Sequence, residues 1–132
     1  MKHRVIKFKQ KGDDRGHLVI VEGMVDIPFE IKRIFYIYGS EMDVVRGNHA
    51  NRKSEFVLIN VSGQSKVKVD DGFETEIVEL NEPHMGIYIP HMVWKEMYDF
   101  SKDSVLLVLS NLHYDPEEYI RNYELYLEEV KQ

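Results

Sequence analysis

Short stretches rich in β-branched and aromatic residues follow one another along most of this chain, and turn-forming residues separate them. This regular spacing is typical of an all-β sandwich or barrel, in which short strands alternate with turns every eight to twelve residues or so. We therefore predict an all-β fold for most of the chain. The expected strands cover residues 5–8, 17–22, 31–38, 55–61, 65–69, 73–80, 86–90, 93–100 and 104–110.

Two parts of the pattern also predict how strands are covered. Residues 66–69 and 74–78 alternate polar and apolar side chains, as strands of an antiparallel sheet with one wet face do. Between them, Asp70-Asp71-Gly72 is the strongest hairpin signal in the chain. Residues 105–109 are apolar without alternation, so we expect that strand to be covered on both faces.

The pattern changes at the C-terminus. Asp115 is a suitable N-cap and Pro116 suits the first helical position. Aromatic and apolar residues then recur at helical spacing, which predicts one amphipathic helix over about 115–131, packed on the sheet or on a partner. We interpret its tyrosines as packing residues. The whole chain, 1–132, is expected to be one domain, with the barrel over about 1–112.

Composition and charge exclude several classes of function. The 132 residues include 17 Lys and Arg against 23 Asp and Glu, and the net charge of −6 argues against a general nucleic-acid binder. A local basic cluster would still bind a small anion. The absence of cysteine excludes disulfides, thiolate nucleophiles and iron–sulfur sites. The N-terminus has no apolar signal-peptide region and no apolar run spans a bilayer, so we expect a cytoplasmic protein without membrane contact.

The densest polar chemistry lies in residues 46–55, "RGNHANRKSE". Their order of Gly, His and Glu, followed by Gly63, resembles the first cupin motif, and residues 86–95 resemble the second. In metal-binding cupins the ligands would stand at His49, Asn51, Glu55 and Lys95. A transition-metal site needs imidazoles where this chain has an amide and an ammonium. We therefore expect no metal and no other cofactor.

Segments along nearly the whole chain form one further pattern: "VIKF", Asp14-Arg15-Gly16, "IPFEIKRIFYIY", "RGNHANRK", "VDDG", "VWKEMYDFS" and "YDPEEYIRNYELY". In this order and spacing they resemble the cupin-type sugar-nucleotide 3,4-ketoisomerases of the FdtA/QdtA, WxcM-like family. The resemblance implies a jelly-roll barrel and a homodimer whose N-terminal strands exchange between subunits. It also implies a dTDP-linked 4-oxo-6-deoxyhexose substrate, dTDP-4-oxo-6-deoxyglucose, whose ketone moves from C-4′ to C-3′.

The resemblance also implies roles for the residues of the first motif. His49 matches the family's catalytic base, whereas Asn51 stands where the family has a second histidine. A neutral imidazole suits proton transfer from C-3′ to C-4′ near pH 7. Lys95 and Asn51 would stabilise the enediolate charge. Tyr36 is a candidate proton relay, although strand alternation leaves open whether Tyr36 or Phe35 faces inward.

Two of these assignments have an alternative on the sequence alone. Lys95 is expected to face the barrel interior, but a shifted strand would place its ammonium group outside. Asn51 either contacts the substrate or holds the backbone. Trp94, next to Lys95, is expected to pack against the protein instead of stacking on a base.

Substrate binding is expected from arginines, because guanidinium groups match phosphate oxygens. The candidates are Arg15, Arg33 and Arg46, and Glu55 belongs to the same polar cluster. Arg15 resembles the members of the family that form the galacto product, so we favour that product. Two other functions stay open: a cupin-type dTDP-sugar epimerase, and a sugar-nucleotide-binding cupin without catalysis.

Overall fold

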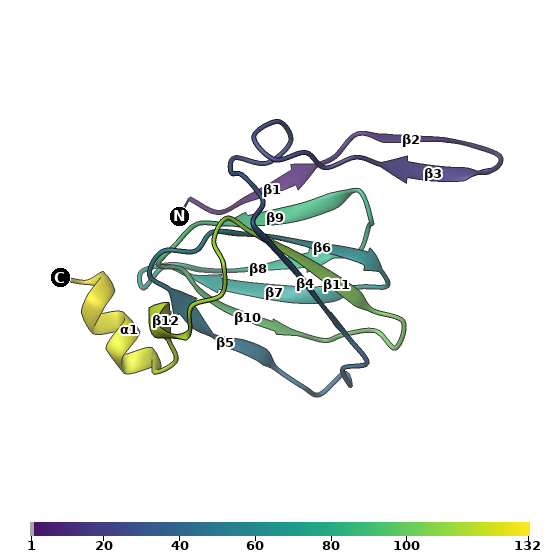
Figure 1. The fold of residues 1–132 in the computed structure, drawn as a ribbon. Helices are drawn as coiled ribbons and strands as arrows, with labels where there is room; N and C mark the ends of the chain where they lie inside the picture. Colours follow the sequence, from purple (N-terminus) through teal and green to yellow (C-terminus); the bar gives the residue numbers. More distant parts are fainter. Residues whose placement is uncertain (1) are drawn as a thin grey trace.

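The computed structural model describes residues 2–132, which form two five-stranded antiparallel sheets that face each other (Figure 1). The strand orders are β1-β9-β6-β11-β4 and β12-β5-β10-β7-β8, and the two sheets do not close into one hydrogen-bonded barrel. The predicted all-β fold is confirmed. The strands are β1 (Arg4–Lys7), β2 (Gln10–Asp13), β3 (Gly16–Val19), β4 (Arg33–Tyr38), β5 (Arg46–Asn51), β6 (Phe56–Ser62), β7 (Ser65–Asp70), β8 (Thr75–Leu80), β9 (Met85–Ile89), β10 (Trp94–Tyr98), β11 (Val105–Ser110) and β12 (Tyr119–Ile120).

Apolar side chains fill three layers, because both sheets carry apolar residues on both faces. The main cluster lies between the sheets and includes Leu58, Val69 and Leu106. A second cluster covers the outer face of the first sheet, where Phe8, Phe29 and neighbouring residues pack on β6 and β11. The predicted burial of residues 105–109 on both faces follows from this arrangement: alternate side chains of β11 belong to the first and second clusters.

The hairpin predicted at Asp70-Asp71-Gly72 joins β7 to β8, with Ser65 opposite Leu80 and Asp70 opposite Thr75. Gly72 has φ +92°, a conformation that side chains with a Cβ rarely adopt. The Asp71 carboxylate accepts hydrogen bonds from the backbone N–H groups of Phe73 and Glu74 and fixes the turn.

Three strands were not predicted: β2, β5 and β12. The sequence pattern assigned the region of β2 to a turn, but β2 pairs with β3 in a hairpin of exposed residues that projects from the sandwich (Figure 1). The residues of β5 were interpreted only as part of the polar motif over residues 46–55 and not as a strand. Its inward-facing residues are polar, so it lacks the apolar alternation by which strands are recognised.

The C-terminal helix is shorter than predicted. Asp115 caps only a 3₁₀ turn, Pro116–Glu118, and the chain then forms β12, which pairs with Ala50 and Asn51 of β5. The helix α1 (Tyr123–Val130) begins after its own N-cap, Asn122. Ile120 is buried, and strand pairing together with this burial outweighs the helical spacing of the sequence. No helix in residues 2–132 has the length and apolar character needed to cross a membrane.

The tyrosines of α1 pack, as expected, against the outer face of the second sheet. Tyr126 is fully buried, and its hydroxyl oxygen lies 2.9 Å from the backbone carbonyl oxygens of both Asp70 and Met92, which share its one proton. Trp94 packs on the rings of Tyr123 and Tyr126, with centroids 5.2 and 5.7 Å away. Because Trp94 occupies this outer face, the next residue of β10, Lys95, points between the sheets.

Candidate active site

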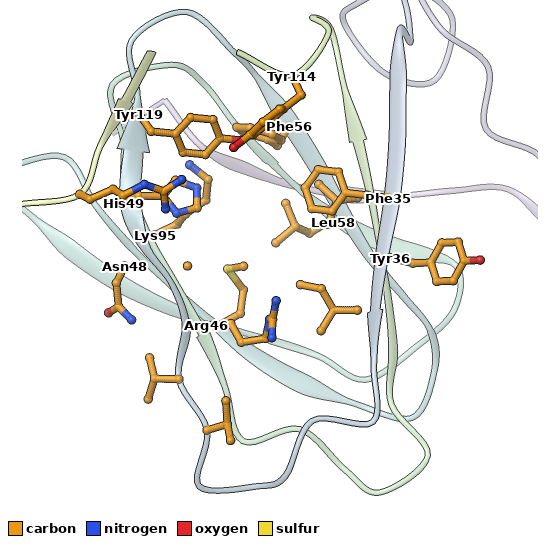
Figure 2. Close-up of a pocket in the computed structure, with 17 residues that line it drawn as sticks. Phe35, Tyr36, Arg46, Asn48, His49, Phe56, Leu58, Lys95, Tyr114 and Tyr119 are labelled. Carbon is orange, nitrogen blue, oxygen red and sulfur yellow. The ribbon is translucent and has the colours of Figure 1, made fainter. Parts of the chain in front are cut away.

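A cavity of about 530 Å³ opens between the two sheets, a volume in the range of small-molecule sites (Figure 2). Strands β4, β5, β6 and β10 form its walls, and the segment before α1 covers one side. Three of its lining residues are cations, Arg46, Lys95 and Arg121, and no described lining residue is acidic. The cavity therefore favours an anionic ligand.

A bulge in β5 aims His49 into this cavity. Gly47 and Asn48 both have positive φ, +88° and +55°, and the register with β10 shifts between Lys95 and Glu96. A Cβ on Gly47 would lie 2.9 Å from the carbonyl oxygen of Lys95, so the close approach of the strands requires glycine. Such a bulge redirects the following side chains, and His49 comes to lie directly opposite Lys95.

His49 is held as a neutral imidazole. Burial lowers the pKa of His49, and the positive charge of Lys95 lowers it further, to about 4. Its ring lies 4.8 Å from the ring of Tyr119, and its Nδ1 atom has no well-aligned hydrogen-bond partner. A neutral imidazole at pH 7 has the form that a general base needs.

Lys95 faces the interior, as predicted. Its Nζ atom donates to Asn51 Oδ1 at 3.1 Å and lies 4.7 Å from the centre of the Phe56 ring. Burial lowers the pKa of Lys95 to about 7, although the charge of Glu118 opposes this. An amine with such a pKa exchanges protons readily near neutral pH. Asn51 is buried behind the cavity and holds Lys95 in place.

Glu55 does not reach the cavity, and Tyr36 borders the cavity but turns its side chain away from it, so both expected roles require correction. In β4 the Phe35 side chain points inward and Tyr36 points away, with 61% of Tyr36 exposed (Figure 2). Alternation along the strand makes the two mutually exclusive. The Glu55 carboxylate accepts hydrogen bonds from Tyr88 and Asn111 and does not line the cavity.

Arg15 also lies away from the cavity within its own chain. It stands at the turn of the β2–β3 hairpin, with 86% of its side chain exposed, and pairs with Asp13 at 2.7 Å. The hairpin projects beyond the sandwich (Figure 1), and Arg15 is not among the residues that line the cavity.

The other predicted arginines lie at the cavity. Arg46 lines it, and Arg33 lies beside it, 5.6 Å from the ring of Tyr114 and 3.5 Å from the Tyr119 hydroxyl oxygen. The sequence reasoning missed Arg121, which lines the cavity and lies 4.7 Å from the ring of Tyr119.

The segment that brings these missed residues to the site was assigned to a helix. Tyr119 and Arg121 come to the cavity because the chain pairs with β5 there instead of coiling. The "YDPEEYIRNYELY" segment was noted for its resemblance, but helical spacing alone gave no sign of a second element before α1.

The positions that hold a metal in other cupins do not fit one here. Glu55 points elsewhere, and Lys95 would place an ammonium group against a cation. Among residues 2–132, no three His, Cys, Asp or Glu side chains gather in a group suited to a metal ion.

A family model and a curated protein that match this chain both indicate the same family. Residues 1–131 match the family model described as FdtA: WxcM-like, C-terminal. A curated protein from Aneurinibacillus thermoaerophilus, TDP-4-oxo-6-deoxy-alpha-D-glucose-3,4-oxoisomerase, is 43% identical over 94% of this chain and 89% of its own length.

Two solved structures are close in fold. The crystal structure of the sugar 3,4-ketoisomerase QdtA from Thermoanaerobacterium thermosaccharolyticum, in complex with TDP, is 46% identical, with a TM-score of 0.95 over 98% of this chain and 94% of that chain. A 3,4-ketoisomerase from Helicobacter canadensis is 40% identical, with a TM-score of 0.97 over 100% of this chain and 99% of that chain.

Proposed function

Because this chain belongs to the FdtA, WxcM-like family of sugar-nucleotide 3,4-ketoisomerases, we propose that it moves the ketone of dTDP-4-oxo-6-deoxyglucose from C-4′ to C-3′. The observation that carries the proposal is the pairing of a neutral His49 with Lys95 across one cationic cavity. The proposed location is the cytoplasm. The ligand of QdtA, TDP, supports the choice of nucleotide.

In the first proposed step, His49 removes the proton from C-3′. The electrons of that C–H bond form a C-3′=C-4′ double bond, and the carbonyl electrons move to O-4′. Lys95 protonates O-4′ and gives an enediol, in place of the relay that Tyr36 was expected to provide. An ammonium group at this position stabilises the charge as it develops on oxygen.

The second step reverses these roles. The Lys95 amine takes the proton from O-3′, a carbonyl forms at C-3′, and C-4′ takes a proton from His49 after the proton on the imidazole has exchanged with solvent. The amine and the imidazole both return to their starting forms, and no electron acceptor is needed. A pKa of Lys95 near neutrality suits both halves of this exchange.

The nucleotide diphosphate is assigned to the arginines at the cavity. Arg46 and Arg121 line the cavity, and Arg33 lies next to its aromatic wall. Forked guanidinium groups bind phosphate oxygens well. For the configuration at C-4′ we keep the galacto product, on the resemblance of Arg15 to that group of the family.

The function is tested by NMR of dTDP-4-oxo-6-deoxyglucose with the protein in heavy water. We expect a 3-oxo product that carries deuterium at C-4′. Deuterium next to an unmoved carbonyl would instead indicate an epimerase, and binding without exchange would indicate a non-catalytic protein. The coupling pattern of the C-4′ proton, read in light water, distinguishes the galacto from the gluco product.

We further propose a homodimer in which the β2–β3 hairpin of one subunit carries Arg15 to the cavity of the other. The hairpin has exposed residues on both strands and projects from its own sandwich, which supports an exchange between subunits. Arg15 would then add a positive charge to a site that its own chain cannot reach.

This arrangement predicts activity in mixed dimers. Arg15→Ala is expected to lower kcat/KM about tenfold, since it removes a charge-assisted contact. When Arg15→Ala and His49→Asn chains are mixed, exchange of hairpins restores one intact site in each mixed dimer. Random mixing should then recover about a quarter of the wild-type activity. A monomer in light scattering, or no recovery on mixing, would contradict the proposal.

A further inference from the structure

Glu118 is a buried carboxylate just outside the cavity, and the proposed reaction does not use it. It precedes β12, whose Tyr119 lies opposite Asn51 of β5. Only 4% of the residue is exposed. Its Oε1 atom accepts the backbone N–H groups of Lys53 at 3.0 Å and Ser54 at 2.8 Å, and its Oε2 atom accepts the Ser54 hydroxyl group.

These contacts keep Glu118 ionised. Burial works against the charge, but the hydrogen bonds from Ser54 and Lys53, with a looser contact from the Asn51 side chain, hold the pKa of Glu118 below its usual value. A buried carboxylate needs a counter-charge. The neighbouring Arg52 does not supply it, because its guanidinium group is paired with Glu129 at 2.7 Å.

The counter-charge lies on the other side of Asn51. Lys95 Nζ donates to Asn51 Oδ1 at 3.1 Å. The buried Asn51 Nδ2 atom has no well-aligned hydrogen-bond partner, but it is close enough to Glu118 to help lower the pKa of that carboxyl group. Asn51 therefore lies between the ammonium group in the cavity and the carboxylate behind it. The charge of Glu118 acts on Lys95 in the direction that favours the protonated amine.

We propose that Glu118 is a positioning residue for the isomerisation: through Asn51 it fixes Lys95 in the cavity and keeps it protonated for its proton transfer to the substrate. The kinetic part of this proposal rests on the proposed function, but the pairing itself does not. Lys95 stands at a position that holds a metal ligand in metal-binding cupins. In this chain the Glu118 carboxylate, which is distant in sequence, stabilises the Lys95 ammonium group through Asn51.

Among the described residues that line the cavity around Lys95, none is an aspartate or a glutamate. The charged and titratable groups that face it around the cavity are neutral or cationic, so each cation there disfavours its protonation. Without the negative charge of Glu118, nothing would oppose the lowering of the Lys95 pKa by burial and by these cations. The groups are His49 and Arg46 on β5, Arg33 on β4, Tyr119 on β12, and Tyr114 and Arg121 on the C-terminal segment.

The test is Glu118→Gln, with Glu117→Gln as the matched control. A glutamine oxygen still accepts the Lys53 and Ser54 N–H groups, so the change removes mainly the charge. Glu117 is adjacent and exposed. The pKa of Lys95 is measured from the ¹³Cε shift in protein labelled with ¹³C-lysine and assigned by Lys95→Met, and kcat is measured against pH.

In wild-type protein we expect kcat to fall as pH rises through the pKa of Lys95, because protonated amine is lost. In Glu118→Gln the pKa of Lys95 and this basic limb should both move down by about one unit or more. Glu117→Gln should move neither. A folded Glu118→Gln protein with an unchanged Lys95 pKa would overturn the proposal. A shifted pKa in a protein without any isomerase activity supports the pairing and counts against the proposed function alone.

A double variant keeps the pairing testable if Glu118→Gln unfolds. An unpaired buried ammonium group is costly, and Lys95→Met removes it. We therefore expect Glu118→Gln/Lys95→Met to be folded, with a higher melting temperature than Glu118→Gln alone. The proposal would be overturned if the double variant melted at the same temperature as Glu118→Gln, or if its loss of stability were the sum of the losses of the two single variants.

Discussion

His49→Asn is expected to lower kcat by about 10³-fold, the usual contribution of a positioned general base. The amide fits the space of the imidazole but cannot take a proton from C-3′. The neutral state of His49, which burial and Lys95 enforce, is the form that this step needs. The measurement is turnover of dTDP-4-oxo-6-deoxyglucose by NMR in heavy water, which also reports exchange at C-3′.

The matched control is His91→Asn, the same substitution at an exposed histidine in the turn before β10. It should leave kcat within about twofold of wild type. Because His49 acts in chemistry, TDP should still bind to His49→Asn with nearly unchanged affinity. Turnover that survives in His49→Asn would move the base to another residue, and loss of TDP binding would make His49 a binding group.

Lys95→Met should lower kcat by about 10²- to 10³-fold, because the oxygen atoms of the enediolate lose their proton donor. Methionine has a similar length and suits the apolar contacts of the cavity, including the Phe56 ring that Lys95 faces at 4.7 Å. The substitution therefore removes the amine with little loss of packing.

Two effects on stability oppose each other in Lys95→Met. Burial holds the pKa of Lys95 far below its usual value, so removal of the amine relieves the cost of burying its charge, but it also leaves the Glu118 carboxylate without its counter-charge. At pH 7 we therefore expect Lys95→Met to melt within a few degrees of wild type, whereas Lys102→Met, at an exposed position, should change neither activity nor melting. A large fall in melting temperature for Lys95→Met would show that its lost activity reflects unfolding.

The sequence alone predicted the fold class and half of the site, since both depend on local patterns. Alternation of side chains identified most strands, and Asp70-Asp71-Gly72 identified a hairpin, because a turn needs particular residues at particular positions. The resemblance of two segments to the cupin motifs implied that His49 and Lys95 share one site, and the structure brings them opposite each other.

The tertiary structure decided which side chains share the cavity. The bulge at Gly47 and Asn48 sets the direction of His49, and alternation turns Tyr36 outward once Phe35 faces the core. Neither side-chain direction can be predicted without the register between strands, because a shift of one residue exchanges the two faces of a strand.

The contribution of the C-terminus also came from tertiary structure alone. Residues 119–121 were predicted to be part of a helix, yet Tyr119 and Ile120 pair with β5. This pairing brings Tyr119 and the following Arg121 to the cavity and Glu118 behind Asn51. Helical spacing is a local property, whereas strand pairing over some 70 positions depends on the surface that β5 leaves open. Sequence patterns thus determined the scaffold and its chemistry, and long-range pairing determined which charges meet.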